Sequence, residues 1–183
     1  MGYYEYTPDC TIPGVGTDAL NWERLGDIYL WDVPLAYLWS PIVFHELKDA
    51  PSREGDFPSL YQYPALPVFS QRAWDVLDSL MACRWEALPI IHPSGKPFYI
   101  IHVMETIDCL DIERSQGVDL FDDGRVMRVE RYWLRNEMLL GKHVFKTTIA
   151  SGAELFVDDV FRDAVEKNGL KGLEFRALPT VGR

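Results

Sequence analysis

The segment from residue 154 to residue 178 limits the possible folds most, because it combines two hydrophobic periods with clear boundary signals. Residues 155–157 are apolar and favour a strand, and Asp158 is a residue type that begins helices. Helical spacing then relates the apolar residues Val160, Phe161, Ala164 and Val165. Residues 168–169, Asn-Gly, end that helix, and strand-like alternation follows over residues 173–177. The segment therefore predicts strand, helix and strand in that order.

A similar pattern occupies residues 67–91. A short apolar run precedes Ser70, a helix-capping residue type, and residues 85–91 have the composition of a strand. The helical stripe between them consists of Ala73, Trp74, Val76, Leu77, Leu80 and Met81. We therefore expect an α+β fold: a mainly antiparallel sheet with two short amphipathic helices packed on it, arranged as two similar strand–helix–strand units. A chance likeness of two amphipathic helices stays open as the alternative.

The rest of the chain divides into a turn-rich first third and a more regular remainder. In the first third we expect a strand at 28–31, a strand or short helix within 36–47, and a loop over 48–59. In the remainder we expect hairpins of 85–91 with 98–104 and of 118–121 with 125–134, one helical turn at 136–140, and a strand at 143–147. We accordingly distinguish residues 1–66, part of or appended to the same domain, from an α+β domain over residues 67–183.

Three short motifs occur in an order that resembles one protein family. They are Asp108, Leu110, Asp111 and Ser115 after an apolar strand; the strand entry at residues 141–145; and Gly169, Leu170, Gly172, Leu173 and Phe175 near the end. Together they resemble a family of bacterial immunity proteins of polymorphic toxin systems, over roughly residues 67–178. The resemblance assigns structural roles to Asp108, Leu110, Asp111, Ser115, Gly169, Gly172 and Phe175.

The resemblance implies a function through binding. An immunity protein is a non-enzymatic inhibitor that binds a cognate toxin domain in the cytoplasm of the producing bacterium. It implies no catalytic residue, no cofactor, no metal and no membrane partner, and it leaves the oligomeric state open. The sequence also favours the absence of a membrane partner, since no apolar run approaches the length of a membrane span and no signal peptide is visible.

Acidic charge is concentrated in the first third of the chain. Residues 1–66 hold ten acids and three bases, and residues 67–183 hold eighteen acids and fifteen bases, for a net charge of −10. Such a surface repels nucleic acid and attracts cationic proteins, for example the basic active site of a nuclease toxin. The candidate toxin-binding residues are Asp18, Trp22, Glu23, Asp27, Tyr29, Trp31 and Asp32. Ordinary solvated or packing roles are the alternative for each of them.

Two other function classes stay open. Asp108, Asp111 and Glu113, with His102, would suit a small metal-dependent hydrolase. Aspartates that follow strands more commonly cap turns, however, and a histidine within an apolar strand is typically buried and hydrogen-bonded. The surplus of aromatic residues would also suit a scaffold or oligomerisation module. The odd number of cysteines, Cys10, Cys83 and Cys109, indicates reduced thiols.

Overall fold

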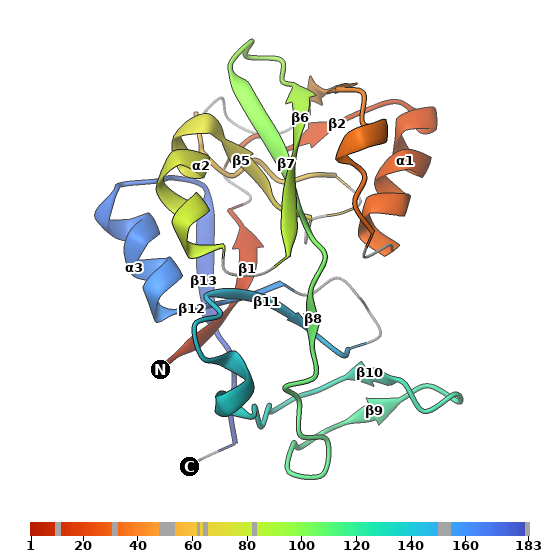
Figure 1. Cartoon of the computed structure of the whole chain (residues 1–183), viewed down its shortest axis with the longest axis vertical. Coiled ribbons are helices and arrows are strands. Elements are labelled where there is room, and N and C mark those ends of the chain that lie inside the picture. The colour runs from red at the N-terminus through yellow and green to blue at the C-terminus, as the bar shows by residue number, and fades with distance from the viewer. Residues whose placement is uncertain are drawn as a thin grey trace.

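The structure is a computed structural model of the chain, and its described part contains two main sheets arranged along the long axis (Figure 1). It describes residues 1–9, 12–30, 33–47, 54–61, 63, 66–81, 84–149 and 155–181, with backbone only for 27–30. Within these ranges, no helix has both the length and the apolar character needed to cross a membrane.

The larger sheet has five strands in the order β13-β1-β12-β11-β8. Its strands in chain order are β1 Tyr3–Pro8, β8 Thr106–Ile107, β11 Val144–Thr147, β12 Leu155–Asp158 and β13 Leu173–Ala177. The N-terminal strand β1 lies inside this sheet and is antiparallel to both β12 and β13. Only β8, at one edge, runs parallel to its neighbour β11. The first residues of the chain are therefore paired with its last two strands.

The second sheet has four strands in the order β3-β6-β7-β5. Its strands are β3 Ile42–Val43, β5 Val68–Ser70, β6 Trp85–Ile91 and β7 Pro97–Val103. The hairpin predicted between β6 and β7 is confirmed, with seven paired residues from Trp85↔Val103 to Ile91↔Pro97. Two small sheets complete the described strands: β2 Val15–Gly16 with β4 His45–Glu46, and β9 Asp119–Leu120 with β10 Val126–Arg128.

The helices predicted beside Ser70 and Asp158 are confirmed together with their caps. The described helices are α1 Ala19–Leu30, α2 Gln71–Leu77 and α3 Asp159–Lys167, with 3-10 turns η1 Ala36–Leu38, η2 Asp78–Leu80 and η3 Asn136–Leu139. Ser70 Oγ accepts a hydrogen bond from the Ala73 N–H at 3.1 Å, and Asp158 Oδ1 accepts one from the Phe161 N–H at 3.0 Å. Helix α3 ends at Lys167, and Gly169, two residues later, has a left-handed φ of +60°.

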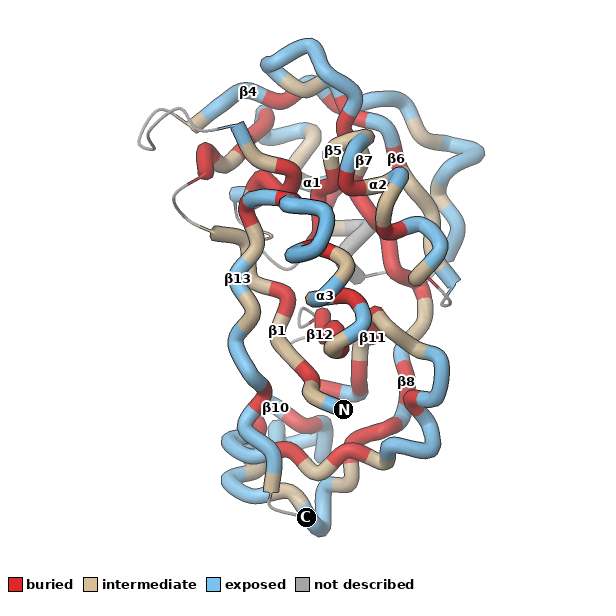
Figure 2. Tube along the Cα trace, turned by 90° about the vertical axis from the view of Figure 1, so that its left-hand side faces the viewer, coloured by how far each residue is buried: buried red, intermediate tan, exposed pale blue. Residues whose placement is uncertain are grey.

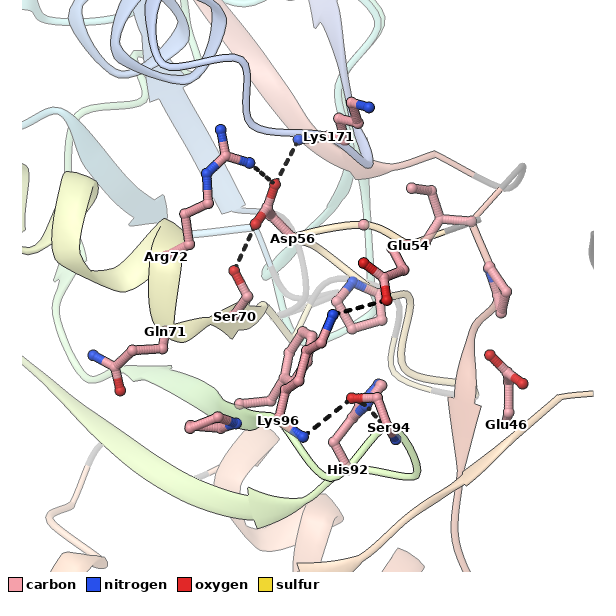
Figure 3. A pocket seen from close by; sticks show the side chains of 16 residues that line it. Glu46, Glu54, Asp56, Ser70, Gln71, Arg72, His92, Ser94, Lys96 and Lys171 are labelled. Atoms are coloured by element: carbon pink, nitrogen blue, oxygen red, sulfur yellow. Dashed lines mark hydrogen bonds and ion pairs between the residues drawn. The ribbon is translucent and has the colours of Figure 1, made fainter. Parts of the chain in front are cut away.

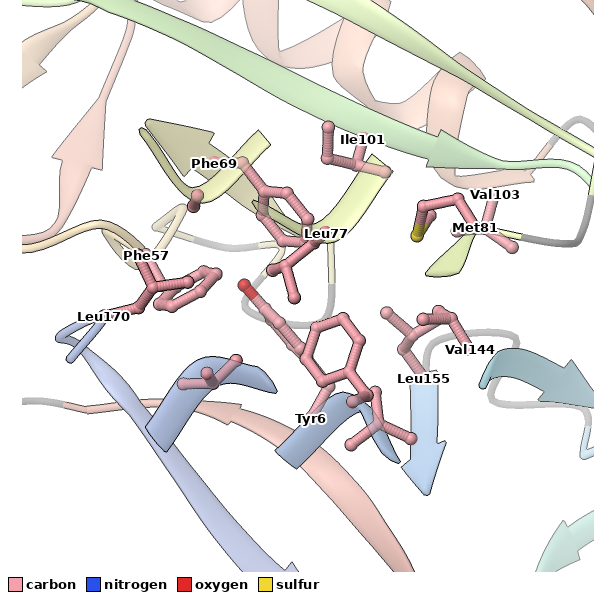
Figure 4. Close-up of a cluster of buried hydrophobic side chains, with 14 residues drawn as sticks. Tyr6, Phe57, Phe69, Leu77, Met81, Ile101, Val103, Val144, Leu155 and Leu170 are labelled. Atoms are coloured by element: carbon pink, nitrogen blue, oxygen red, sulfur yellow. The ribbon is translucent and has the colours of Figure 1, made fainter. Parts of the chain in front are cut away.

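A shared hydrophobic core joins the two sheets (Figure 4). Helices α2 and α3 contact each other, and beneath them side chains from both sheets meet. Tyr6 comes from the five-stranded sheet, Phe69 and Ile101 come from the four-stranded sheet, and Phe57 comes from a connecting segment. Figure 2 shows this buried interior between exposed outer loops. The α+β class is thereby confirmed, whereas the division into two similar units stays a prediction.

The predicted strand at residues 28–31 is wrong, because α1 continues to Leu30. Asp18 begins that helix: its Oδ1 accepts a hydrogen bond from the Asn21 N–H at 2.9 Å. Leu25 is fully buried on the inner side of the helix. Cap and burial together outweigh the strand preference of Ile28 and Tyr29, and Trp31 lies outside the described residues.

The other predictions for irregular regions are partly met. Residues 36–47 contain both a short helix, η1, and two short strands, β3 and β4. The hairpin predicted over 118–134 forms, but its paired strands β9 and β10 are shorter than expected. The predicted loop at 48–59 contains no helix or strand over its described residues, 54–59.

Candidate functional site

The residues predicted to contact a toxin lie on and after helix α1. Asp18 and Glu23 are exposed. Trp22 is half-buried, with its ring 6.1 Å from that of Tyr61 and 6.0 Å from that of Tyr63. The remaining candidates, the side chains of Asp27 and Tyr29 and the whole of Trp31 and Asp32, lie outside the described residues. On this helix Trp22 therefore packs against the core, while Asp18 and Glu23 face solvent.

An exposed apolar surface lies along the edge of the four-stranded sheet beside α1. We call it the η1 edge, and it consists of Tyr37, Leu38, Val43 and Ile91, which are 78%, 70%, 60% and 52% exposed. Val43 of β3 and Ile91 of β6 are paired neighbours in parallel strands. Their residue types alone would place them in the core, so sequence reasoning did not identify this surface.

Hydrogen bonds attach the chain segment of the η1 edge firmly to β6. The Glu86 carboxylate accepts bonds from the backbone N–H groups of Leu35 at 2.6 Å and Ala36 at 3.0 Å. Further along the same strand, the Trp39 indole Nε1 donates to the Pro89 carbonyl at 2.8 Å. Residues 35–43 therefore run along β6 in a fixed position.

His102 completes this arrangement from the neighbouring strand β7. As predicted, it is a buried, hydrogen-bonded histidine: it is 1% exposed, and its Nδ1 lies 3.0 Å from Glu86 Oε1. Burial raises the pKa of Glu86, but hydrogen bonds from His102 and from the Leu35 and Ala36 backbone outweigh it and leave the pKa below its usual value. Glu86 thus stays ionised while it holds η1.

The carboxylates considered for a metal-dependent hydrolase occupy a turn and its surroundings. Asp111 Oδ1 accepts a hydrogen bond from the Arg114 N–H at 3.1 Å, as expected of a turn residue. Asp108 is exposed, 3.9 Å from Arg135, and Glu113 is exposed as well. Across the described part of the chain, no three His, Cys, Asp or Glu residues are grouped so that they would hold a metal ion. The geometry gives the hydrolase alternative no support.

The other residues of the family-like motifs make contacts within the fold. Leu110 is buried, and Ser115 Oγ accepts from the Trp133 N–H at 3.0 Å while donating to the Asp111 carbonyl at 2.6 Å. Gly172 has a left-handed φ of +106°, and a Cβ there would meet Ile12 and the Phe57 carbonyl. The Phe175 ring packs 5.9 Å from that of Tyr4.

A pocket of about 670 Å³ lies between α2 and the β6–β7 turn (Figure 3). At its wall, the Asp56 carboxylate accepts hydrogen bonds from Ser70 Oγ at 2.7 Å, Arg72 Nη1 at 3.1 Å and the Lys171 N–H at 2.9 Å. Lys96 pairs with Glu54 at 2.7 Å. Asp56 therefore connects three separate segments of the chain, a role that no local sequence pattern indicated.

Cys109 is a free thiol in the core. Its Sγ lies 3.4 Å from Thr147 Oγ1, and burial is the main cause that raises its pKa above the usual value. The thiol is therefore protonated at neutral pH and unsuited to act as a nucleophile. Cys10 and Cys83 lie outside the described residues.

Comparison with known proteins agrees with the resemblance seen in the sequence. The model of the immunity protein family (Imm11) matches residues 45–180, which is well over half of the chain. The match includes all three motifs and begins earlier than the resemblance, which started at residue 67. A search of curated proteins finds no match. On the strength of the family match, the chain belongs to the immunity protein family (Imm11).

Proposed function

We propose that this protein binds and neutralises a cognate bacterial toxin domain in the cytoplasm of the toxin-producing cell, as part of a polymorphic toxin system, and that it catalyses no reaction. The observation that carries the proposal is the family match over residues 45–180. Neutralisation then consists of covering the toxin's working surface. That mode of action requires a rigid surface with anchoring side chains and complementary charge.

The acidic first third favours a basic toxin. Residues 1–66 have a net charge of −7, counted from ten acids and three bases. If the toxin is a nuclease, carboxylates of this region occupy the positions that phosphate groups take in its substrate. The candidates Asp18 and Glu23 are exposed on α1 and available for this role.

We also infer that two similar strand–helix–strand units form the rigid frame. Helix α2 connects β5 to β6, and α3 connects β12 to β13. In each case a third strand lies between the two connected strands and is antiparallel to both: β7 in one sheet and β1 in the other. The position of β1, Tyr3–Pro8, between β12 and β13 supports the proposal that residues 1–66 and residues 67–183 form one domain.

The test uses the toxin domain encoded beside this protein's gene, purified in a catalytically inactive form. Titration calorimetry should show one-to-one binding, and co-expression with the active toxin should restore cell growth. Absence of binding would refute the proposal. Light scattering of the same purified protein without the toxin measures its oligomeric state.

A second measurement separates inhibition by binding from enzymatic inactivation. The active toxin is mixed with the protein, separated under denaturing conditions and refolded. A binding inhibitor acts only at stoichiometric amounts and leaves the toxin's mass and recovered activity unchanged. Lasting inactivation by substoichiometric amounts would instead identify an enzyme.

A further inference from the structure

We infer that the η1 edge is the surface that docks on the toxin, and that it inserts into an apolar hollow with a basic rim. This inference rests on the proposed function and specifies which surface carries it. Four observations support it: exposed apolar anchors, their rigid attachment, the charge around them, and the contrast with the opposite end of the molecule.

The first observation is the exposure of large apolar side chains along residues 35–43 and the strand β6 that this segment follows. Tyr37 and Leu38 are adjacent in η1 and are 78% and 70% exposed. Val43 and Ile91 are paired across β3 and β6 and are 60% and 52% exposed. Exposed apolar side chains that recur along one segment mark a candidate interaction site, and a tyrosine is among the residue types that dominate binding energy.

The second observation is that the backbone carrying these apolar side chains is already fixed in the free protein. Glu86 binds both N–H groups at the start of η1, and Trp39 is bonded to Pro89 at its end. The guanidinium of Arg24 lies 5.0 Å from the Trp39 ring and donates to the Ser40 carbonyl at 2.9 Å. Binding through this edge therefore requires little further ordering of the backbone, which favours affinity.

The third observation is the sign of the charge beside the edge. Within residues 12–47, the described charged side chains are three acids, Asp18, Glu23 and Glu46, and one base, Arg24. That base is directed toward Trp39, Ser40 and Asn21. Asp18, which caps α1, and Glu23 on α1 are exposed, and just before the helix Thr17 Oγ1 donates to the Val43 carbonyl at 2.8 Å. A partner that fits this surface carries positive charge around its apolar hollow.

The fourth observation concerns the other end of the molecule, which also exposes apolar residues. They are Leu120, Phe121, Met127, Met138 and Leu140. There, however, opposite charges alternate and pair, as in Arg125 with Asp123 at 2.7 Å and Arg128 with Glu130 at 3.3 Å. Acids and bases are therefore interspersed at this end, whereas three of the four charged side chains described within residues 12–47 are acidic, and this end serves as the control surface.

The experiment compares single alanine variants at the two surfaces, with the inactivated toxin domain as the probe. Tyr37→Ala and Leu38→Ala should each weaken binding at least about 30-fold, as expected for central anchors. Leu140→Ala removes a side chain that is 80% exposed at the opposite end and should change binding less than about threefold. All three side chains are exposed, so thermal unfolding should be unaffected and binding alone should change.

Hydrogen exchange on the complex supplies an independent measurement. Amides of residues 35–43 should gain protection when the toxin binds, while those of the β9–β10 hairpin should not. If both η1 variants bind the toxin as tightly as the wild-type protein does, this inference is overturned and the proposed function stands. Protection located at the hairpin would have the same consequence. Failure of the wild-type protein to bind the toxin would overturn both. A self-associated dimer that keeps the η1 edge covered in the toxin complex would also overturn it.

Discussion

Tyr6 combines deep burial with an unpaired hydroxyl. The residue is 5% exposed, and its hydroxyl oxygen has no hydrogen-bond partner in the described part of the chain. Its ring packs with those of Phe57 and Phe69, each 6.4 Å away (Figure 4). Burial raises the pKa of the hydroxyl above its usual value, so the group is neutral. A buried polar group without a partner lowers stability.

Removing this hydroxyl should therefore stabilise the protein. We expect Tyr6→Phe to raise the free energy of unfolding in denaturant by about 1 kcal/mol. Tyr3→Phe is the matched control, because the Tyr3 hydroxyl donates to Asn136 Oδ1 at 3.1 Å from an equally buried ring. That control should lower stability by about 1 kcal/mol. A loss of stability in Tyr6→Phe would show that the hydroxyl has a partner.

At the scale of elements, the turn between β6 and β7 contains a histidine that resists protonation. The His92 ring stacks on Phe98 at 4.0 Å, and its Nδ1 accepts from the Ser94 N–H at 3.2 Å. Burial first, and then the charge of Lys96, lower the pKa of His92 to about 4 from the usual 6.5. Between pH 4 and pH 6.5, His92 therefore binds a proton more readily in the unfolded chain than in the folded one. The contribution of His92 to stability is therefore complete above pH 6.5 and is lost as the pH falls toward 4.

NMR titration of the ring protons tests this assignment. His92 should titrate near pH 4, and Lys96→Met should move its pKa upward because one repelling charge is removed. His92→Gln should flatten the decline of unfolding free energy between pH 6.5 and 4. A His92 that titrates at its usual value in the wild-type protein would disprove the burial of the ring in this turn.

Elements with local signals were predictable from the sequence. Helix α3 has its cap at Asp158 and its stop signal at Gly169 within twelve residues, and both signals act on neighbouring backbone groups. Helix α1 was missed because its last residues favour strands, whereas a cap at Asp18 and burial of Leu25 decide the outcome. Local preference therefore fails where tertiary burial opposes it.

The site was less predictable than the elements, because exposure depends on the fold. Leu38 is a residue type usually assigned to a core and Tyr37 is one of intermediate burial, yet both are exposed in η1, whose start is attached to Glu86. Glu86 itself is fifty residues from Ala36 along the chain. Strand β1 was missed for the same reason, since its partners β12 and β13 lie at the other end of the sequence.

At the scale of the whole molecule, the charge distribution bears on how the proposed toxin partner would approach. The net charge is −10, and residues 1–66 carry −7 of it. If the proposed toxin is basic, it is attracted before contact, and the association rate constant should fall as salt screens the attraction. Reversing the charge of single acids at different places tests whether the attraction depends on total charge or on its position. If only total charge matters, every such reversal should change the association rate constant equally. Two exposed glutamates allow this comparison: Glu23 on α1 and Glu113 in the turn at the opposite end.

Glu23→Lys and Glu113→Lys change the net charge of the molecule equally, from −10 to −8, so any difference between them reports position. If the toxin approaches through the η1 edge, Glu23→Lys should lower the association rate constant several-fold at low salt and make it less dependent on salt, while Glu113→Lys should have a much smaller effect. Stopped-flow mixing with the inactivated toxin over a range of salt concentrations measures both. Equal effects of the two variants would mean that net charge alone attracts the partner. A larger effect of Glu113→Lys would place the encounter at the opposite end of the molecule.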